Sequence, residues 1–305
     1  MPELSRLPEK ERDDSYGGEW TVQKLNVVAD YLGSYLTALS KQRFRKCYID
    51  AFAGRGYVKL RETRMSHGLS EQCLLFHELA DEEIQTVLAG SARRALEIER
   101  PFEEYIFIDK SKECCAELMR LKEQYPERNV SIICDEANSS VTNLCKTTWH
   151  WQRAVMFLDP FALEVDWATV KAIAKTKAVD LWLWFPIGSV NRLFKKDGRI
   201  PVAWRTCLNR ILGTNKWYEE LYSVESDPVL FETDSDRVEK ASVEVIGRYF
   251  IDRLKSVFPP NGVAKPGVFR NSKNCPIFLL CFAAANENGA DIAINIANHL
   301  LRGLH

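Results

Sequence analysis

The stretch that decides the fold reads Tyr48-Ile49-Asp50-Ala51-Phe52-Ala53-Gly54-Arg55-Gly56. Its first half is apolar apart from one aspartate, so it predicts a buried strand. The strand runs directly into two glycines spaced one residue apart. Glycine tolerates positive φ angles and lets the backbone approach a ligand closely. The stretch therefore predicts a strand that ends in a ligand-binding turn.

A second apolar run, residues 154–158, stops at Asp159-Pro160-Phe161. In open α/β sheets the ligand binds outside the carboxyl ends of the strands. We expect the two corners to share that edge, the first holding a nucleoside cofactor and the second holding the group that reacts. Asp-Pro also marks ordinary turns, and in that interpretation Phe161 joins the core.

Strand patterns alternate with helical patterns along most of the chain. Further strands are expected at residues 105–109, 130–134, 178–185 and 276–283. The run at 178–185 is nearly all apolar, which is typical of a strand covered on both faces. The alternation predicts an α/β fold with a Rossmann-like, doubly wound parallel sheet and helical insertions.

Breaks in this pattern suggest a division of the chain. We expect a loose N-terminal arm at residues 1–19, a main domain at 20–187 and 267–305, an insertion at 57–89, and a largely helical insertion or cap at 188–266. Helices are expected at 20–39, 71–79, 202–212, 216–221 and 238–257. The insertion at 57–89 follows the glycine turn, so a role as a lid or substrate-contacting flap is a hypothesis.

Composition narrows the class of protein. With 305 residues, 46% of them hydrophobic, the chain can bury one substantial core. The formal net charge of −1 gives no global basic field, so contact with nucleic acid would need a local patch. Nine scattered cysteines suggest mostly buried thiols in a reducing compartment and no metal site. Without a leader pattern or a membrane-span pattern, we expect a soluble cytoplasmic protein with no membrane partner.

Acidic residues stand at the ends of four expected strands. They are Asp50, Asp109, Asp135 and Asp159, with Glu136 directly after Asp135. One such aspartate is usually a helix cap or a turn former, but four at one sheet edge suit a nucleoside ligand. A carboxylate beyond the second strand can accept both ribose hydroxyls, and one beyond the third can accept the adenine amine. The candidate cofactor-binding residues are Asp50, Phe52, Ala53, Gly54, Gly56, Asp109, Asp135 and Glu136.

The glycine turn fits neither of two common nucleotide motifs. A dinucleotide site would need a third glycine, and no phosphate-binding G-x-x-x-x-G-K-[ST] exists in the chain. The run Asp50 to Gly56 instead resembles the first motif of S-adenosylmethionine-dependent methyltransferases, particularly those that act on nucleic-acid amines. Asp159-Pro160-Phe161 resembles their fourth motif. The resemblance implies S-adenosylmethionine as the cofactor, nucleic acid as the substrate and a class I methyltransferase fold.

That second corner has a specific chemistry. An aspartate and a main-chain carbonyl that accept the two hydrogens of an exocyclic base amine restore electron density on its nitrogen, while an aromatic ring stacks on the extruded base. Asp159 would be the acceptor and Phe161 the stacking platform, with Pro160 between them. Methyl transfer needs the nitrogen, the methyl group and the sulfur aligned, so positioning supplies most of the acceleration.

A closer resemblance covers most of the chain. Asp180-Leu181-Trp182, Phe185-Pro186-Ile187-Gly188 and Asn191-Arg192-Leu193 resemble the three-Cys-motif partner family. This implies a phage-related methyltransferase-like protein whose partner, a three-Cys-motif protein, is encoded nearby. Asn191 and Arg192 are candidates to contact substrate or phosphate, and a salt-bridged helix start is an equal alternative. Ala162 stands where the family more often has glycine, so a catalytically inactive binding partner in a mobile-element or phage-defence system is the alternative function.

Overall fold

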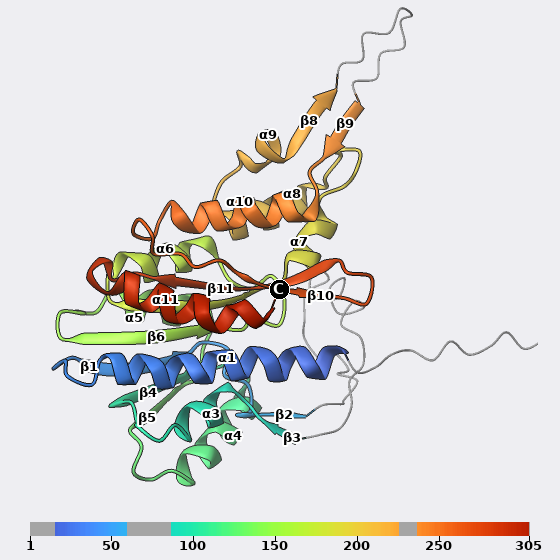
Figure 1. Cartoon of the computed structure of the whole chain (residues 1–305). Coiled ribbons are helices and arrows are strands. Elements are labelled where there is room, and N and C mark those ends of the chain that lie inside the picture. Colours follow the sequence, from blue (N-terminus) through green and yellow to red (C-terminus); the bar gives the residue numbers. More distant parts are fainter. Residues whose placement is uncertain (1–15, 60–86, 226–236, 305) are drawn as a thin grey trace, which may run out of the picture.

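The computed structural model describes residues 16–59, 87–225 and 237–304. Its main sheet has seven strands (Figure 1). In order across the sheet these are β10 (Gly267–Arg270), β11 (Pro276–Ala284), β7 (Val179–Phe185), β6 (Gln152–Leu158), β1 (Arg45–Asp50), β4 (Glu104–Ile108) and β5 (Val130–Ile133).

Strand direction brings the carboxyl ends of five strands to one edge of this sheet. The five strands from β7 to β5 run parallel to one another, and β11 is antiparallel to both β7 and β10. The carboxyl ends of β1, β4, β5, β6 and β7 therefore lie at the same edge. This confirms the predicted doubly wound α/β fold.

The strand register sets how far the strand-end acids lie from one another along the strand direction. Asp50 is paired with Phe107 on β4 and with Phe157 on β6. Asp109 and Asp159 each follow two residues after those partners, a rise of about 7 Å along the strand. The sequence could not fix this register, which depends on how the strands pair.

Helices cover both faces of the sheet (Figure 1). The helices whose buried side chains join the core on one face are α1 (Tyr16–Ala38), α3 (Ser91–Leu96), α4 (Lys112–Glu123) and α11 (Ala290–Leu301). Those on the other face are α5 (Ala137–Cys145), α6 (Trp167–Lys175), α7 (Ile187–Leu193), α8 (Val202–Leu212), α9 (Trp217–Leu221) and α10 (Val243–Lys255).

Short elements complete the described chain. Two antiparallel ribbons, β2 (Tyr57–Lys59) with β3 (Val87–Ala89) and β8 (Tyr222–Glu225) with β9 (Arg237–Lys240), stand outside the main sheet. The 3₁₀ turns are η1 (Glu287–Gly289) and η2 (Arg302–Leu304).

The helical segment that follows β7 packs into the main core. The ring of Phe250 on α10 stacks on Phe185 of β7 with a centroid separation of 3.6 Å. Leu208 of α8 and Leu254 of α10 are fully buried in the same apolar cluster as the sheet. The residues expected to form a cap thus also cover one face of the sheet, because their apolar stripes need a surface to bury against.

Several expected boundaries need correction. Residues 16–19, expected in the loose arm, belong to α1, which begins four residues before the predicted helix. The predicted helix at 238–257 is two elements: β9 takes its first residues, and α10 begins only after the Ser242 hydroxyl accepts a capping hydrogen bond from the Val245 N–H. The rest of the arm and the helix predicted at 71–79 lie outside the described residues.

Cysteine burial is also lower than expected. Of the eight described cysteines, four are buried, while Cys134 and Cys275 are exposed. Within the described ranges, no helix is both long and apolar enough to cross a membrane.

Candidate functional site

The glycine turn after β1 lies at the carboxyl edge of the sheet. Gly54 and Gly56 have positive φ angles of 59° and 75°, which residues with a side chain adopt only with strain. Among the described residues, a Cβ atom on Gly54 would meet no atom within 4 Å, whereas one on Gly56 would lie 2.6 Å from Cδ2 of Leu121. Within the described parts of the chain, the backbone at Gly54 therefore faces open space, while Gly56 packs against α4.

Hydrogen bonds fix this turn to its neighbours. The N–H of Ala53 donates to the Ile108 carbonyl at 3.0 Å, which ties the turn to the end of β4. The N–H of Phe52 donates to Oδ1 of Asp50 at 3.3 Å. Three predicted cofactor-binding residues, Phe52, Ala53 and Gly54, thus lie together at the sheet edge.

Asp50 is fully buried at the end of β1. Burial is the main cause that raises its pKa to about 7; a hydrogen bond from Ser91 opposes the rise, and the nearby negative charge of Asp159 adds to it. The hydroxyl of Tyr48 also donates to Oδ2 of Asp50 at 3.3 Å. Asp50 and Asp159 are therefore close enough to interact electrostatically, as the β1–β6 register requires.

Asp159 forms an ion pair with a residue that sequence reasoning missed. The Lys24 ammonium on α1 donates to Oδ1 of Asp159 at 2.8 Å and to Oδ2 at 2.7 Å. The Lys24 side chain is 8% exposed and that of Asp159 is 23% exposed. Both oxygens of the predicted catalytic carboxylate thus accept hydrogen bonds from a primary amine of the protein itself.

An aromatic ring completes the surroundings of this amine. Nζ of Lys24 lies 4.5 Å from the centroid of the Trp184 ring, within the range of a cation–π contact. The sequence does indicate that Lys24 is buried. It lies four residues before Val28 and seven before Tyr31, on the buried face of α1. A lysine in such a stripe needs a carboxylate partner, but its identity depends on the tertiary structure.

Pro160 and Phe161 lie just beyond β6. Pro160 is buried, whereas Phe161 is 54% exposed. Phe161 therefore does not join the core, which removes the interpretation of this corner as a turn anchored by a buried ring. An exposed ring thus stands two residues after Asp159.

The carboxylate of Asp109 holds the loops around it. Its Oδ2 accepts a hydrogen bond from the Gly54 N–H at 3.0 Å, and its Oδ1 accepts one from the Ser111 N–H at 2.8 Å. Each carboxylate oxygen can accept a second hydrogen bond, so ribose hydroxyls remain possible partners. The structure thus joins Asp109 directly to the glycine turn.

Glu136 and Asp135 lie after β5, and Glu136 caps α5. Its carboxylate accepts hydrogen bonds from the N–H groups of Asn138 and Ser139, at 2.9 and 2.8 Å. Partial burial acts to raise the Glu136 pKa, but these hydrogen bonds outweigh it and lower the pKa. Asp135 is exposed, and its Oδ1 accepts a hydrogen bond from the Glu136 N–H at 2.8 Å. Cofactor binding by this pair stays a prediction.

Asn191 and Arg192 lie on α7, after β7. The Asn191 carbonyl accepts a hydrogen bond from Nζ of Lys240 at 2.8 Å, which ties α7 to β9. Arg192 is exposed. Their assignment as substrate-binding residues stays a prediction.

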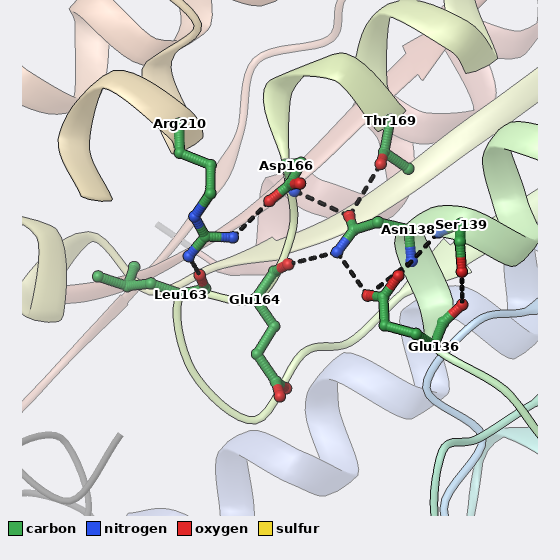
Figure 2. Close-up of polar contacts among 8 residues, drawn as sticks. All are labelled: Glu136, Asn138, Ser139, Leu163, Glu164, Asp166, Thr169 and Arg210. Carbon is green, nitrogen blue, oxygen red and sulfur yellow. Dashed lines mark hydrogen bonds and ion pairs between the residues drawn. The ribbon is translucent and has the colours of Figure 1, made fainter. Parts of the chain in front are cut away.

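A polar network braces the loop between Asp159 and α6 (Figure 2). The Asn138 side chain donates to the Glu164 carbonyl at 2.8 Å and accepts from the Asp166 N–H at 2.9 Å and from the Thr169 hydroxyl at 2.8 Å. From the other side, Arg210 pairs with Asp166 and donates to the Leu163 carbonyl. The loop that carries Phe161 is therefore held at its far end by α5 and α8.

Contacts at the carboxyl edge link three of the predicted site acids to their surroundings. Asp109 accepts a hydrogen bond from Gly54, and buried Asp50 interacts electrostatically with Asp159. Among the described residues, no group of three or more His, Cys, Asp or Glu side chains could hold a metal ion. The chemistry available is hydrogen bonding to an amine, aromatic stacking and close main-chain approach.

The strand order and the single antiparallel strand within the seven define the class. This is the Rossmann-like fold of class I S-adenosylmethionine-dependent methyltransferases. No family model and no curated protein matches the chain.

Solved structures with similar folds include protein LPL1258 from Legionella pneumophila, with a TM-score of 0.52, 12% identity, and coverage of 96% of this chain and 94% of that one. At 12% identity this likeness shows the fold alone. The Streptococcus mutans protein SMU.1697c in complex with SAH has a TM-score of 0.29, 15% identity and coverage of 71% and 97%. The plantazolicin methyltransferase BpumL, also with SAH, has a TM-score of 0.31, 10% identity and coverage of 88% and 88%.

Proposed function

We propose that this protein binds S-adenosylmethionine and transfers its methyl group to an exocyclic amine of a nucleic-acid base. One observation carries the proposal: both carboxylate oxygens of Asp159 accept hydrogen bonds from N–H groups, here those of the Lys24 ammonium, beside an aromatic ring. The same corner lies at the carboxyl edge of the sheet, where open α/β folds bind their ligands.

The residues at the glycine turn fit the cofactor. Gly54 leaves open the space that a Cβ atom would take, and Asp109 is fixed beside it with acceptor positions to spare. Phe52, Ala53, Gly54, Asp109, Asp135 and Glu136 would contact the cofactor, which supplies an electrophilic methyl group when bound. Asp50 and Gly56, which are both buried, would shape the turn that holds it. These assignments also draw support from the resemblance of Asp50 to Gly56 to the first methyltransferase motif.

The amine would be oriented by the second corner. Each oxygen of Asp159 can accept two hydrogen bonds, so a base amine can share the carboxylate with Lys24 or replace it. The exposed ring of Phe161 would stack on the extruded base. Asp159 would accept a hydrogen bond from the amine N–H, which directs the nitrogen lone pair toward the methyl group. As the N–CH3 bond forms and the S–CH3 bond breaks, S-adenosylhomocysteine would leave and one amine proton would pass to the carboxylate or to solvent. Asn191 and Arg192 would contact the rest of the substrate.

Calorimetry tests the cofactor, and labelled methyl transfer tests the chemistry. We expect the protein to bind S-adenosylmethionine and S-adenosylhomocysteine. We also expect Asp159→Ala to abolish transfer of a labelled methyl group to DNA or RNA oligonucleotides while cofactor binding persists. Asp197→Asn, at an exposed loop, is the matched control and should transfer normally. Absence of cofactor binding, both alone and with a three-Cys-motif protein, would end the proposal.

The ion pair also favours a second candidate, a catalytically inactive methyltransferase-fold partner. Lys24 occupies both oxygens of Asp159, and Ala162 leaves less room than glycine beside them. The resemblance to the three-Cys-motif partner family suggests a complex with a three-Cys-motif protein encoded nearby, in a mobile-element or phage-defence setting. An intact complex whose biological effect is unchanged by Asp159→Ala would favour this candidate, and methyl transfer that depends on Asp159 would exclude it.

A further inference from the structure

An open groove with a volume of about 670 Å³ runs between α5, α6 and α8. We call it the α6 groove and define it by Lys146, Ala168, Lys171, Ala172, Lys175 and Arg210, which all line it. Ala168 and Ala172 lie on the same face of α6 as the two lysines, so small side chains leave space between the cationic groups. Of these residues, Arg210 alone was described above, where it braces the loop after Asp159.

The groove concentrates positive charge in a protein whose net charge is −1. Four cations line it against one carboxylate, that of Asp166, which Arg210 already neutralises. Across the described parts of the chain, Lys146, Lys171 and Lys175 form no ion pair, and all three are exposed. Three positive charges are thus left for an external anion.

The spacing of these charges suits an extended polyanion. Lys171 and Lys175 are separated by one helical turn, about 6 Å along the axis of α6. Lys146 reaches the groove from the end of α5, where its ammonium donates to the neutral Asn143 side chain at 3.1 Å. A row of cations along a trough matches a chain of phosphates better than a single compact anion.

The α6 groove is connected by hydrogen bonds and by one loop to the Asp159–Phe161 segment, which we call the amine corner. The loop from Asp159 to Asp166 leads directly into α6. Arg210, in the groove wall, holds this loop through the Leu163 carbonyl at 2.6 Å and through Asp166 (Figure 2). Because α6 runs away from the carboxyl edge of the sheet, Lys171 and Lys175 lie about 6 and 12 Å further along its axis than its first residue, Trp167.

We propose that the α6 groove binds the phosphodiester backbone of the nucleic acid whose base is presented at Asp159. This inference rests on the proposed function and adds the surface that recognises the substrate chain. Phosphate contacts fix the position of a nucleic acid without reading its sequence. The groove therefore supplies the local basic patch that a protein of nearly zero net charge needs in order to bind such a partner.

Fluorescence anisotropy with labelled single-stranded DNA and RNA, without cofactor, tests the groove. The variant combines Lys146→Gln, Lys171→Gln and Lys175→Gln. At about 0.7 released counterions for each phosphate contact on a single strand, its slope of log affinity against log salt should fall in magnitude by about 2. Its affinity at low salt should fall about tenfold or more. The DNA and RNA arms show which backbone is preferred.

The control removes the same charge elsewhere. Lys122→Gln, Lys265→Gln and Lys273→Gln replace three exposed lysines outside the groove and should leave the salt slope within about 0.5 of wild type. Equal losses in the two triple variants would overturn the proposal. Competition by polyglutamate as effective as competition by unlabelled oligonucleotide would also overturn it, because the site would then recognise charge of any kind.

Two measurements distinguish failure of the groove proposal from failure of the methyltransferase proposal. Both triple variants should keep the wild-type melting temperature and, in calorimetry, the wild-type affinity for S-adenosylmethionine. If the protein fails to bind the cofactor but the groove variant still loses oligonucleotide affinity, the methyltransferase proposal fails and the phosphate-binding groove stands.

Discussion

Replacing Lys24 with methionine leaves the Asp159 carboxylate without its ion-pair partner in a partly buried corner. The two hydrogen bonds of 2.8 and 2.7 Å disappear, while a methionine keeps an apolar stem against Trp184. Asp159→Asn is the reciprocal change, because it leaves the Lys24 ammonium buried without a counter-charge.

The expected cost follows from burial. Breaking a fully buried ion pair from one side costs roughly 3–5 kcal/mol, because it leaves an uncompensated charge. Asp159 retains 23% exposure of its side chain, so water can partly solvate the orphaned carboxylate. We therefore expect Lys24→Met to lower the free energy of unfolding by about 3 kcal/mol, the low end of that range. Asp159→Asn should cost more, because the Lys24 side chain is only 8% exposed.

Urea unfolding of a double-mutant cycle measures this coupling. The variant with both Lys24→Met and Asp159→Asn leaves no buried charge, so its cost should be smaller than the sum of the single costs by about 2 kcal/mol or more. The exposed pair Lys255 and Asp252 on α10 serves as the matched control, with a coupling of about 0.3–0.5 kcal/mol. Additive effects at Lys24 and Asp159 would refute the ion pair and, with it, the assignment of the amine corner.

Three further predictions follow from single residues. Burial raises the pKa of Asp180 from 3.8 to about 7, so the folded state holds a proton that the unfolded state releases, and stability should fall between about pH 4 and pH 7. In denaturant titrations at a series of pH values, Asp180→Asn should make this pH-dependent loss of unfolding free energy smaller by up to roughly 4 kcal/mol. The control, Asp291→Asn at an exposed position, should keep the wild-type pH dependence. Gly213 has a φ of 67°, and a Cβ atom there would overlap the Trp167 ring. Gly213→Ala should therefore destabilise by roughly 3 kcal/mol in thermal melts, and a loss below about 0.5 kcal/mol would contradict this packing. Phe161→Ala should weaken oligonucleotide binding by about 1–3 kcal/mol in anisotropy, and unchanged binding would remove its stacking role.

Local patterns were enough to predict the elements that matter for the site. The apolar run before Gly54 predicts a buried strand, and β1 ends at Asp50 as expected. The helix predicted at 202–212 is found with those bounds as α8. Such segments can be predicted because burial on one face produces a periodic pattern of apolar residues, and burial on both faces produces a continuous apolar run.

Boundaries set by partners could not be predicted in this way. Residues 238–240 carry a helical pattern but pair as β9 with β8, because strand pairing between distant segments overrides local propensity. The functions of Glu136 as a helix cap and of Asp109 as an acceptor for the glycine turn likewise depend on neighbours that the spacing of acids does not show.

The sequence by itself determined that acids and glycines follow apolar strands, and hence at which edge of the sheet a ligand is expected. Only the tertiary structure decided that Lys24, 135 residues away in the chain, shares that edge with Asp159. The physical reason is that a strand carries its own burial pattern in its residues, whereas the partner of a buried charge is chosen by how α1 docks on the sheet. The gathering of Lys146, Lys171 and Lys175 into one groove was decided in the same way, by the packing of α5 against α6.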